Sequence, residues 1–121
     1  MRCFMVLIIL SIAALSFAQE TTVSKQAWIK HYQERLPSAF CEEKLFFRQC
    51  YKVSKSECLQ VASSSAKSCL ASKQDQIPGV LQPKDGDHWG GIVAECMWYA
   101  YQTALQKKRI SNVKCDDPNN W

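Results

Sequence analysis

The chain has 121 residues, of which 47% are hydrophobic, and its 15 basic and 11 acidic side chains leave a net charge of +4. This length suits one small domain with a modest core. The charge is too weak and too mixed to indicate nucleic acid as a partner. We read the basic run Lys107-Lys108-Arg109 as charge favoured at a helix C-terminus, rather than as a phosphate or membrane contact.

The first 18 residues predict a secretory signal peptide. Arg2 precedes an apolar run from Phe4 to Leu15, and the small residues before Gln19 suit cleavage after Ala18. The run is shorter than the roughly 20 residues that span a bilayer, which favours a cleaved signal peptide. An uncleaved anchor is the alternative. We expect a mature chain that is exported to the periplasm or secreted, with no stable membrane anchor after cleavage.

The mature part of the chain, residues 19–121, opens with a predicted helix. Ser24 is a suitable N-cap, and apolar residues at helical spacing extend to about Arg35. Pro37 should end this helix, because the residue before a proline is pushed out of helical geometry. Ser38 is then expected to cap a second helix, with acidic residues in its first turn.

A third helix is predicted from the capping box formed by Ser54 and Glu57, a serine followed three residues later by a glutamate. Cys58 and Cys69 are eleven residues apart, which is close to three helical turns, so they share one face. A short turn joins this helix to the preceding one. The sequence therefore predicts an antiparallel helical hairpin over residues 38–72.

Proline and glycine residues mark residues 73–90 as a loop. Asp87 is expected to cap a last helix over residues 88–108, and residues 109–121 form a tail. The aromatic stretch from Met97 to Tyr101 covers nearly the whole circumference of that helix, which indicates a central position. The predicted fold class is all-α, a small disulfide-stapled domain of three to four helices that includes the hairpin.

Six of the seven cysteines lie in the mature chain, and their even number predicts a disulfide framework. At least seven residues separate successive cysteines, and the Cys-x-x-Cys pattern of many zinc and redox sites does not occur. We therefore expect no metal site and no cofactor. The cysteines expected in disulfides are Cys41, Cys50, Cys58, Cys69, Cys96 and Cys115.

The predicted hairpin suggests how these cysteines pair, with one bond near its turn and one at its open end. The three expected pairs are Cys50–Cys58, Cys41–Cys69 and Cys96–Cys115. Six cysteines allow fifteen connectivities, so other pairings remain open. The arrangement partly resembles the twin Cys-x9-Cys helical hairpins of the mitochondrial intermembrane space, although eight and ten residues separate the cysteines here.

The stretch Asp85-Gly86-Asp87-His88-Trp89 is a weak candidate for a polar site. Two carboxylates and an imidazole could hold a metal, or Asp85 or Asp87 could orient His88 as a general base in a small hydrolase. No nucleophile accompanies them in the sequence, and a calcium loop needs further oxygen ligands at fixed steps. The alternative, which we favour, is a turn whose Asp87 caps a helix, with no catalytic residue.

Aromatic residues are numerous for so small a domain, and they serve either the core or a protein interface. Met97 and Tyr99 are expected on the inner faces of the last helix. Trp98 and Tyr101 are therefore the better interface candidates. Trp121 ends the tail and is a third candidate.

Five sequence elements resemble those of a group of short exported bacterial proteins with no assigned function. They are "FFRQCY", "IPGVL", "DGDHWGG", "AEC" and the ending "CDDPNNW". The resemblance covers most of the mature chain and implies a Gram-negative periplasmic or secreted protein, without implying an activity. We expect a non-enzymatic protein that acts through surface contacts, with a protein as the candidate partner. The alternatives are an inhibitor or immunity protein against a toxin or hydrolase, and the small hydrolase.

Overall fold

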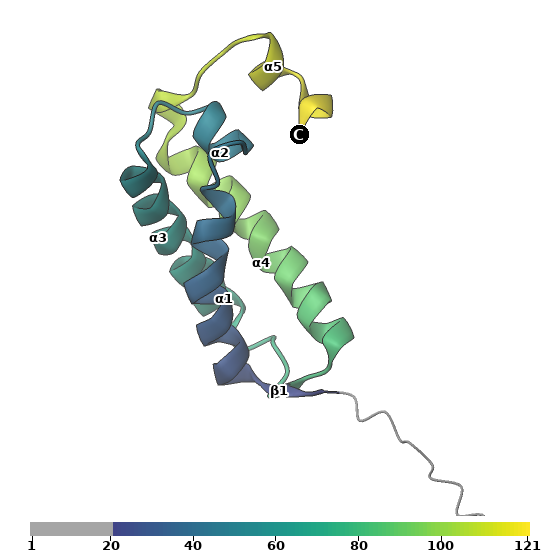
Figure 1. The fold of residues 1–121 in the computed structure, drawn as a ribbon. Helices are drawn as coiled ribbons and strands as arrows, with labels where there is room; N and C mark the ends of the chain where they lie inside the picture. Colours follow the sequence, from purple (N-terminus) through teal and green to yellow (C-terminus); the bar gives the residue numbers. More distant parts are fainter. Residues whose placement is uncertain (1–20) are drawn as a thin grey trace, which may run out of the picture.

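The structure, a computed structural model, describes residues 21–121 (Figure 1). The predicted signal peptide at residues 1–18 lies outside these residues. Three long helices form the body of the domain: α1 (Lys25–Phe40), α3 (Lys55–Lys73) and α4 (Pro83–Ala104). With three disulfides among the described residues, they confirm the predicted small all-α, disulfide-stapled domain.

The shorter elements lie at the two ends of this body. The strands β1 (Val23–Ser24) and β2 (Val80–Leu81) pair antiparallel at one end. The opposite end carries four short helical elements: α2 (Phe46–Gln49), the 3-10 helix η1 (Gln106–Lys108), α5 (Val113–Asp116) and the 3-10 helix η2 (Pro118–Asn120).

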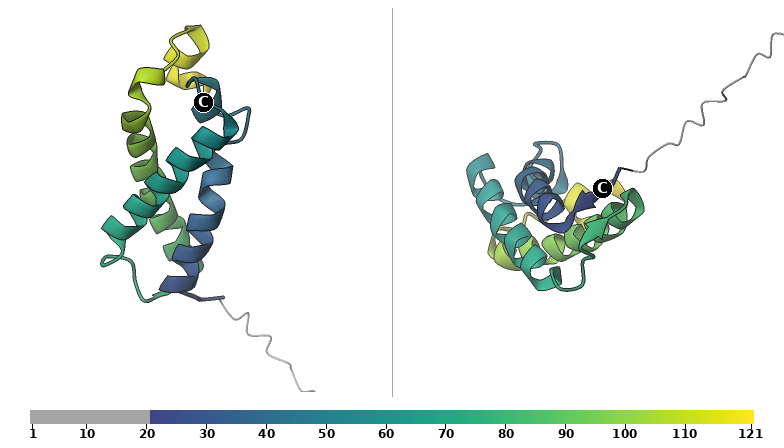
Figure 2. Two further views of the ribbon diagram at one scale, coloured as in Figure 1. Left: turned by 90° about the vertical axis from the view of Figure 1, so that its left-hand side faces the viewer. Right: turned by 90° about the horizontal axis from the view of Figure 1, so that it is seen from below.

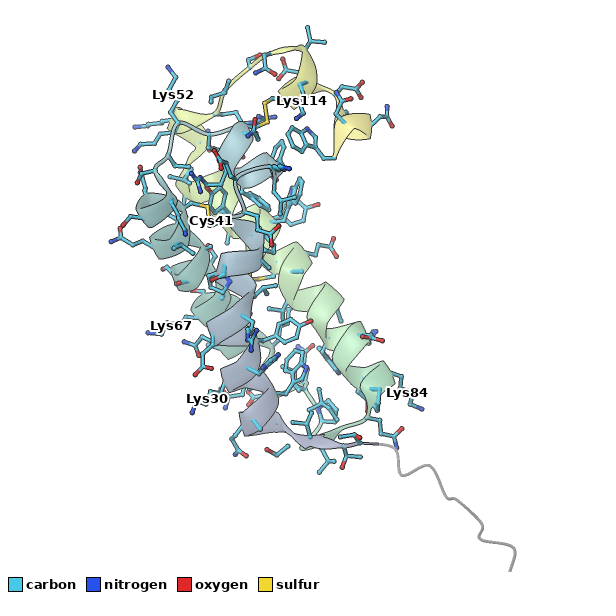
Figure 3. All side chains as sticks on the ribbon, in the orientation of Figure 1. Lys30, Cys41, Lys52, Lys67, Lys84 and Lys114 are labelled. Carbon is cyan, nitrogen blue, oxygen red and sulfur yellow. A yellow bond between two sulfur atoms is a disulfide. The ribbon has the colours of Figure 1, made fainter. Side chains whose placement is uncertain are left out.

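The three long helices alternate in direction. α1 and α4 both run from the β1 end toward the α2 end, and α3 runs the opposite way (Figure 1). α3 packs along both α1 and α4, which it crosses at an angle in Figure 2, whereas the backbones of α1 and α4 come close to each other at few points. Side chains fill the space between these two ribbons (Figure 3). The largest fully buried side chains include Ile77, Leu81, Val93, Met97 and Tyr101.

The first helix begins where the sequence predicted and ends later. The Ser24 hydroxyl accepts a hydrogen bond from the Ala27 amide at 3.2 Å, as expected of an N-cap. Pro37 does not end the helix, which continues to Phe40. A proline inside a helix removes one backbone donor and crowds the preceding turn. Pro37 is buried, and the Cys41 amide still bonds to its carbonyl oxygen at 3.0 Å, so packing and the final turn offset that cost.

The predicted helix after Ser38 is wrong, and with it the hairpin over residues 38–72. The segment between α1 and α3 contains the single turn α2, and α3 pairs with α1 instead. A disulfide joins Cys41, just after α1, to Cys58 in the first turns of α3. This bond brings the two helix ends together, so the residues between them fold back as a compact connection.

The Ser54 cap is confirmed, since its hydroxyl accepts the Glu57 amide at 3.1 Å. The Glu57 side chain forms an ion pair with Lys108, rather than the reciprocal bond of a capping box. The last helix begins earlier than predicted, because Pro83 occupies its first turn and the Asp85 carboxylate accepts the Gln82 amide at 2.9 Å. The expected Asp87 cap is therefore wrong.

All six predicted cysteines are paired, but the predicted pairing is wrong. The observed bonds are Cys41–Cys58, Cys50–Cys115 and Cys69–Cys96. The prediction placed every bond within the hairpin or between the last helix and the tail. In the folded chain the second bond ties the end of α2 to α5, and the third ties α3 to α4. The likeness to twin Cys-x9-Cys hairpins is not confirmed.

Candidate interaction surface

An aromatic cluster surrounds Phe46 at the α2 end of the domain. The ring of Trp98, from α4, stacks on Phe46 with ring centroids 5.0 Å apart and planes inclined by 9°. Trp121, the last residue, meets the same ring edge-on at 5.4 Å. Phe40 at the end of α1 stacks on Phe47 at 4.6 Å. Residues from four parts of the chain thus meet in one cluster.

Arg109 holds the tail against this cluster. Its guanidinium lies 4.8 Å from the centre of the Phe46 ring, a cation–π contact. The same group donates hydrogen bonds to the carbonyl oxygens of Cys50 at 3.3 Å, Ile110 at 3.0 Å and Cys115 at 2.9 Å. The sequence reading of Arg109 as a helix-end charge missed this role, because the contacts join segments far apart in the chain.

Backbone pairing and side-chain caps fix the tail further. The Ile110 amide bonds to the Cys50 carbonyl at 2.8 Å. The Asn112 side chain accepts the Cys115 amide at 2.7 Å and so caps α5. The Trp121 indole N–H donates to the Lys114 carbonyl at 3.2 Å, which docks the end of the chain. Trp121 therefore has a defined position.

Two cavities flank Trp98, which forms a wall of each. The first, of about 340 Å³, is lined by Phe46, Trp98, Gln102, Arg109, Cys115, Asp116, Pro118 and Trp121. The second, of about 350 Å³, is lined by Phe40, Ala94, Glu95, Trp98 and Tyr99. We name the aromatic residues of these two cavities the aromatic surface: Phe40, Phe46, Trp98, Tyr99 and Trp121.

The residues predicted for an interface divide between this surface and the core. Trp98 and Trp121 are each 37% exposed and lie on the aromatic surface. Tyr101 is 0% exposed, so the expectation that it lies outside is wrong. Its hydroxyl donates to the Phe47 carbonyl at 2.8 Å. Burial, with smaller contributions from neighbouring Tyr51 and Glu57, raises the pKa of Tyr101 to about 12.

Of the two residues expected on the inner faces of the last helix, one is buried and the other is exposed. Met97 is fully buried as expected, whereas Tyr99 is 64% exposed and belongs to the aromatic surface. The reason is that α3 covers one side of α4, while the backbone of α1 comes close to α4 at few points. A helix covered on one side leaves part of an all-round aromatic pattern in solvent.

The weak polar-site candidates lie at the other end of the domain, in the first turns of α4, where Figure 3 labels Lys84. The Asp85 carboxylate accepts a hydrogen bond from the Gln82 amide. His88 is exposed, and its ring meets Trp89 edge-on at 5.3 Å. Asp87 is exposed. Burial raises the pKa of Tyr32, and the negative charge of Asp87 raises it further. Among residues 21–121, no group of three or more His, Cys, Asp or Glu side chains is placed to hold a metal ion.

Comparison with known proteins places the chain in a family. A family model described as "T2SS substrate NttA" matches residues 22–115, which include all six paired cysteines. No curated protein and no solved structure matches the chain. Within the described part of the chain, no helix combines the length and apolarity needed to cross a membrane. The chain belongs to the T2SS substrate NttA family, a family of type II secretion substrates, and is thus a small exported protein, as its sequence predicted.

Proposed function

We propose that this exported protein is not an enzyme and acts by binding a protein partner through its aromatic surface. The observation that carries the proposal is the position of Trp98. One face of its ring stacks on Phe46, while 37% of the residue stays exposed between two cavities. Tryptophan and tyrosine anchors near the centre of a contact supply much of the binding energy in protein interfaces.

The rigidity of the surface supports the same proposal. The Cys50–Cys115 disulfide and the hydrogen bonds of Arg109 hold the tail in place. Trp121 is docked through its indole N–H. A surface that is already ordered loses less conformational entropy when a partner binds, so more of the contact energy appears as affinity. An inhibitor or immunity protein is one form of this function, in which the partner is a toxin or a hydrolase.

Capture experiments test the proposal. The oxidised mature protein, tagged at its N-terminus so that Trp121 stays free, is used to capture proteins from periplasmic extract and from conditioned medium. We expect a partner that Trp98→Ala and Tyr99→Ala variants fail to retain. Val113→Ala is the matched control, because Val113 is 90% exposed on α5 and lines neither cavity. Circular dichroism confirms that each variant is folded.

A partner that the Trp98→Ala variant retains as well as the wild type would show that binding occurs elsewhere on the molecule. Capture that is equally reduced by Val113→Ala would point to the tip of α5 instead. Either result would remove the aromatic surface from the proposed function.

A further inference from the structure

The disulfides of the folded chain, which we call the native bonds, mostly do not join neighbouring cysteines. Only one of the three joins cysteines that are consecutive in sequence. Cys41 passes over Cys50 to reach Cys58, and Cys50 pairs with Cys115, 65 residues away. The two spans overlap without one enclosing the other. A chain that joins each cysteine to its nearest neighbour therefore ends with a different set of bonds.

In the unfolded chain, Cys50 meets two non-native partners far more often than its native one. Cys58 lies 8 residues after it, and Cys41 lies 9 residues before it. The entropic cost of closing a loop of n residues grows as about 1.5 RT ln n, so contact over 8 residues is about twenty times as frequent as contact over 65 residues. Non-native bonds of Cys50 are therefore favoured until the chain folds.

Local structure protects Cys69 from a similar error but does not protect Cys50. Cys58 and Cys69 are eleven residues apart on α3, so this helix separates their Cα atoms by about 16 Å, well beyond the roughly 7 Å that a disulfide allows. Cys50 instead follows the single turn α2, and residues 51–54 before α3 are not helical. Formation of α3 therefore leaves both short loops of Cys50 open.

The native partner of Cys50 arrives only when the tail pairs with this segment. The Ile110 amide bonds to the Cys50 carbonyl oxygen at 2.8 Å, and the Lys52 amide bonds to the Lys108 carbonyl oxygen at 2.9 Å. These contacts join distant parts of the chain and need α4 to be packed first. In the folded domain Cys50 is 0% exposed and Cys115 is 5% exposed. Pairing errors must therefore be corrected before the tail docks.

An error at Cys50 closes on itself. Each bond forms when two thiols give two electrons and two protons to an oxidant, here a protein disulfide that becomes a dithiol. With Cys50–Cys58 formed and the third native bond in place, the thiols that remain are Cys41 and Cys115, and the oxidant joins them. All six cysteines of the mature chain are then bonded. The chain has no thiolate left with which to start an exchange.

We propose that maturation of this chain requires a disulfide isomerase, a partner protein with a reactive thiolate, and that it acts at Cys50. Its thiolate attacks the Cys50 sulfur of Cys50–Cys58 and releases Cys58 as a thiolate. Cys58 attacks the Cys41 sulfur of Cys41–Cys115, which forms the native Cys41–Cys58 bond and releases Cys115. Cys115 attacks the Cys50 sulfur of the mixed disulfide, which forms the last native bond and returns the isomerase thiolate. No net oxidation occurs, and the requirement does not depend on what the aromatic surface binds.

The same three exchanges, with Cys41 and Cys58 interchanged, correct a Cys41–Cys50 bond. That error leaves Cys58 and Cys115 as the remaining pair. Both errors therefore share one point of attack, the sulfur of Cys50.

Oxidative refolding of the full mature chain tests the proposal. Reduced, denatured protein is diluted into buffer with diamide, which oxidises thiols and supplies no thiolate. The diamide is removed, and peptide mapping identifies the bonds before and after a catalytic amount of reduced protein disulfide isomerase is added. With Cys69–Cys96 in place, the other four cysteines allow three pairings, so about a third of the chains at most should be native before the addition. The isomerase should raise that yield about threefold and remove the peptides that link Cys50 to Cys58 or Cys41.

Two double variants are matched controls, because each lacks one native disulfide. Cys50→Ser with Cys115→Ser removes the overlapping spans, so the oxidant alone should form both remaining native bonds. Cys69→Ser with Cys96→Ser keeps Cys50 and should still gain about threefold from the isomerase.

Native pairing in most wild-type chains with the oxidant alone would overturn the requirement, as would a yield that the isomerase does not raise. Non-native bonds that avoid Cys50 would overturn its assignment as the point of attack. An equal gain from the isomerase in the two double variants would overturn it as well. The wild-type peptide map decides the first three outcomes even if a double variant fails to fold.

Discussion

The ring of Tyr32 on α1 lies directly against Gly90 on α4. A Cβ atom added at residue 90 would stand 2.7 Å from the ring carbon Cζ of Tyr32, closer than van der Waals contact allows. One turn earlier, a Cβ atom at Gly86 would meet the Trp28 indole nitrogen at 3.4 Å. The Trp28 and Tyr32 rings stack on each other at 4.3 Å. The two glycines therefore make room for the stacked rings between α1 and α4.

Replacing each of two adjacent glycines should change the free energy of unfolding in opposite directions. Gly90→Ala forces the Tyr32 ring to move, and overpacking of this kind costs about 1–3 kcal/mol. Gly91→Ala has nothing within 4 Å of the added methyl group. It should stabilise the helix by about 1 kcal/mol, since alanine favours a helix interior over glycine. Urea denaturation measures both changes.

A second-site variant checks the cause. In a Tyr32→Ala background the ring is gone, so the added Gly90→Ala substitution should no longer destabilise the protein. If Gly90→Ala in the wild-type background proves as stable as Gly91→Ala, the close contact between Tyr32 and α4 is not present in solution.

Tyr101 should make stability depend on alkaline pH. Its pKa is raised to about 12 in the folded chain, against about 10 in the unfolded chain. The unfolded chain loses this proton first as the pH rises. The stability that the protonated phenol contributes is therefore complete below pH 10 and is lost as the pH approaches 12. Tyr101→Phe should flatten this decline, as measured by urea denaturation at a series of pH values.

The same substitution should also lower stability at neutral pH. Without the hydroxyl, the buried Phe47 carbonyl loses its hydrogen bond, at a cost of about 1–2 kcal/mol. Tyr99→Phe, at a position that is 64% exposed, is the control and should resemble the wild type. A Tyr101→Phe variant with an unchanged alkaline decline would argue against the buried phenol.

The disulfide pairing predicts the fragments that peptide mapping of the unreduced protein should yield. They link Cys41 to Cys58, Cys50 to Cys115 and Cys69 to Cys96. A fragment joining Cys50 to Cys58 would restore the pairing expected from the helical hairpin and contradict the fold at the α2 end.

Removal of the disulfide that closes the longest loop should lower the free energy of unfolding the most. Cys50 and Cys115 are 65 residues apart in sequence. By loop-closure entropy their bond contributes about 4 kcal/mol, and each of the other two about 3–4 kcal/mol. The Cys50→Ser, Cys115→Ser variant should melt at a lower temperature and release the tail. Three further tryptophans also fluoresce, so acrylamide quenching is measured with and without Trp121→Phe in both the wild type and this variant. The part of the quenching that Trp121→Phe removes reports that release.

Arg109→Lys should weaken the attachment of the tail although the charge is kept. A lysine ammonium cannot donate in the planar fork that reaches the carbonyls of Cys50 and Cys115, and it stacks less well on Phe46. We expect a loss of about 1–2 kcal/mol in unfolding free energy. Lys107→Arg, at the exposed position two residues earlier, should leave stability within about 0.5 kcal/mol of the wild type.

Local signals in the sequence predicted the parts of the fold that local chemistry decides. Ser24 and Ser54 cap helices because their hydroxyls reach amides three residues away, which needs no information from the rest of the chain. Pro37 misled the prediction, because its burial at the end of α1 is a tertiary effect. Local preference was overridden there by packing.

Long-range partners could not be inferred in the same way. The cysteine spacing gave the number of bonds, but which cysteines meet depends on how α2 and the tail fold back. The aromatic surface shows the same division. Trp98 was recognised as an interface candidate from its place beside inward-facing Met97, whereas Phe46 and Arg109 join it through contacts that only the folded chain creates. Gly86 and Gly90 were read as part of a loop, and their close contacts with Trp28 and Tyr32 exist only in the folded chain.

The pairing of the cysteines also decides what a protease can release. Every peptide bond from Cys41 to Cys115 lies within the span of at least one disulfide, because the Cys41–Cys58 and Cys50–Cys115 spans overlap. A single cut in that region leaves the two pieces covalently joined. α1 precedes Cys41 and is the one long helix of the described chain that a single cut can detach. The contact of the Tyr32 ring with Gly90 helps to hold α1 against α4. An exported protein built this way stays one molecule after a single cut anywhere between Cys41 and Cys115.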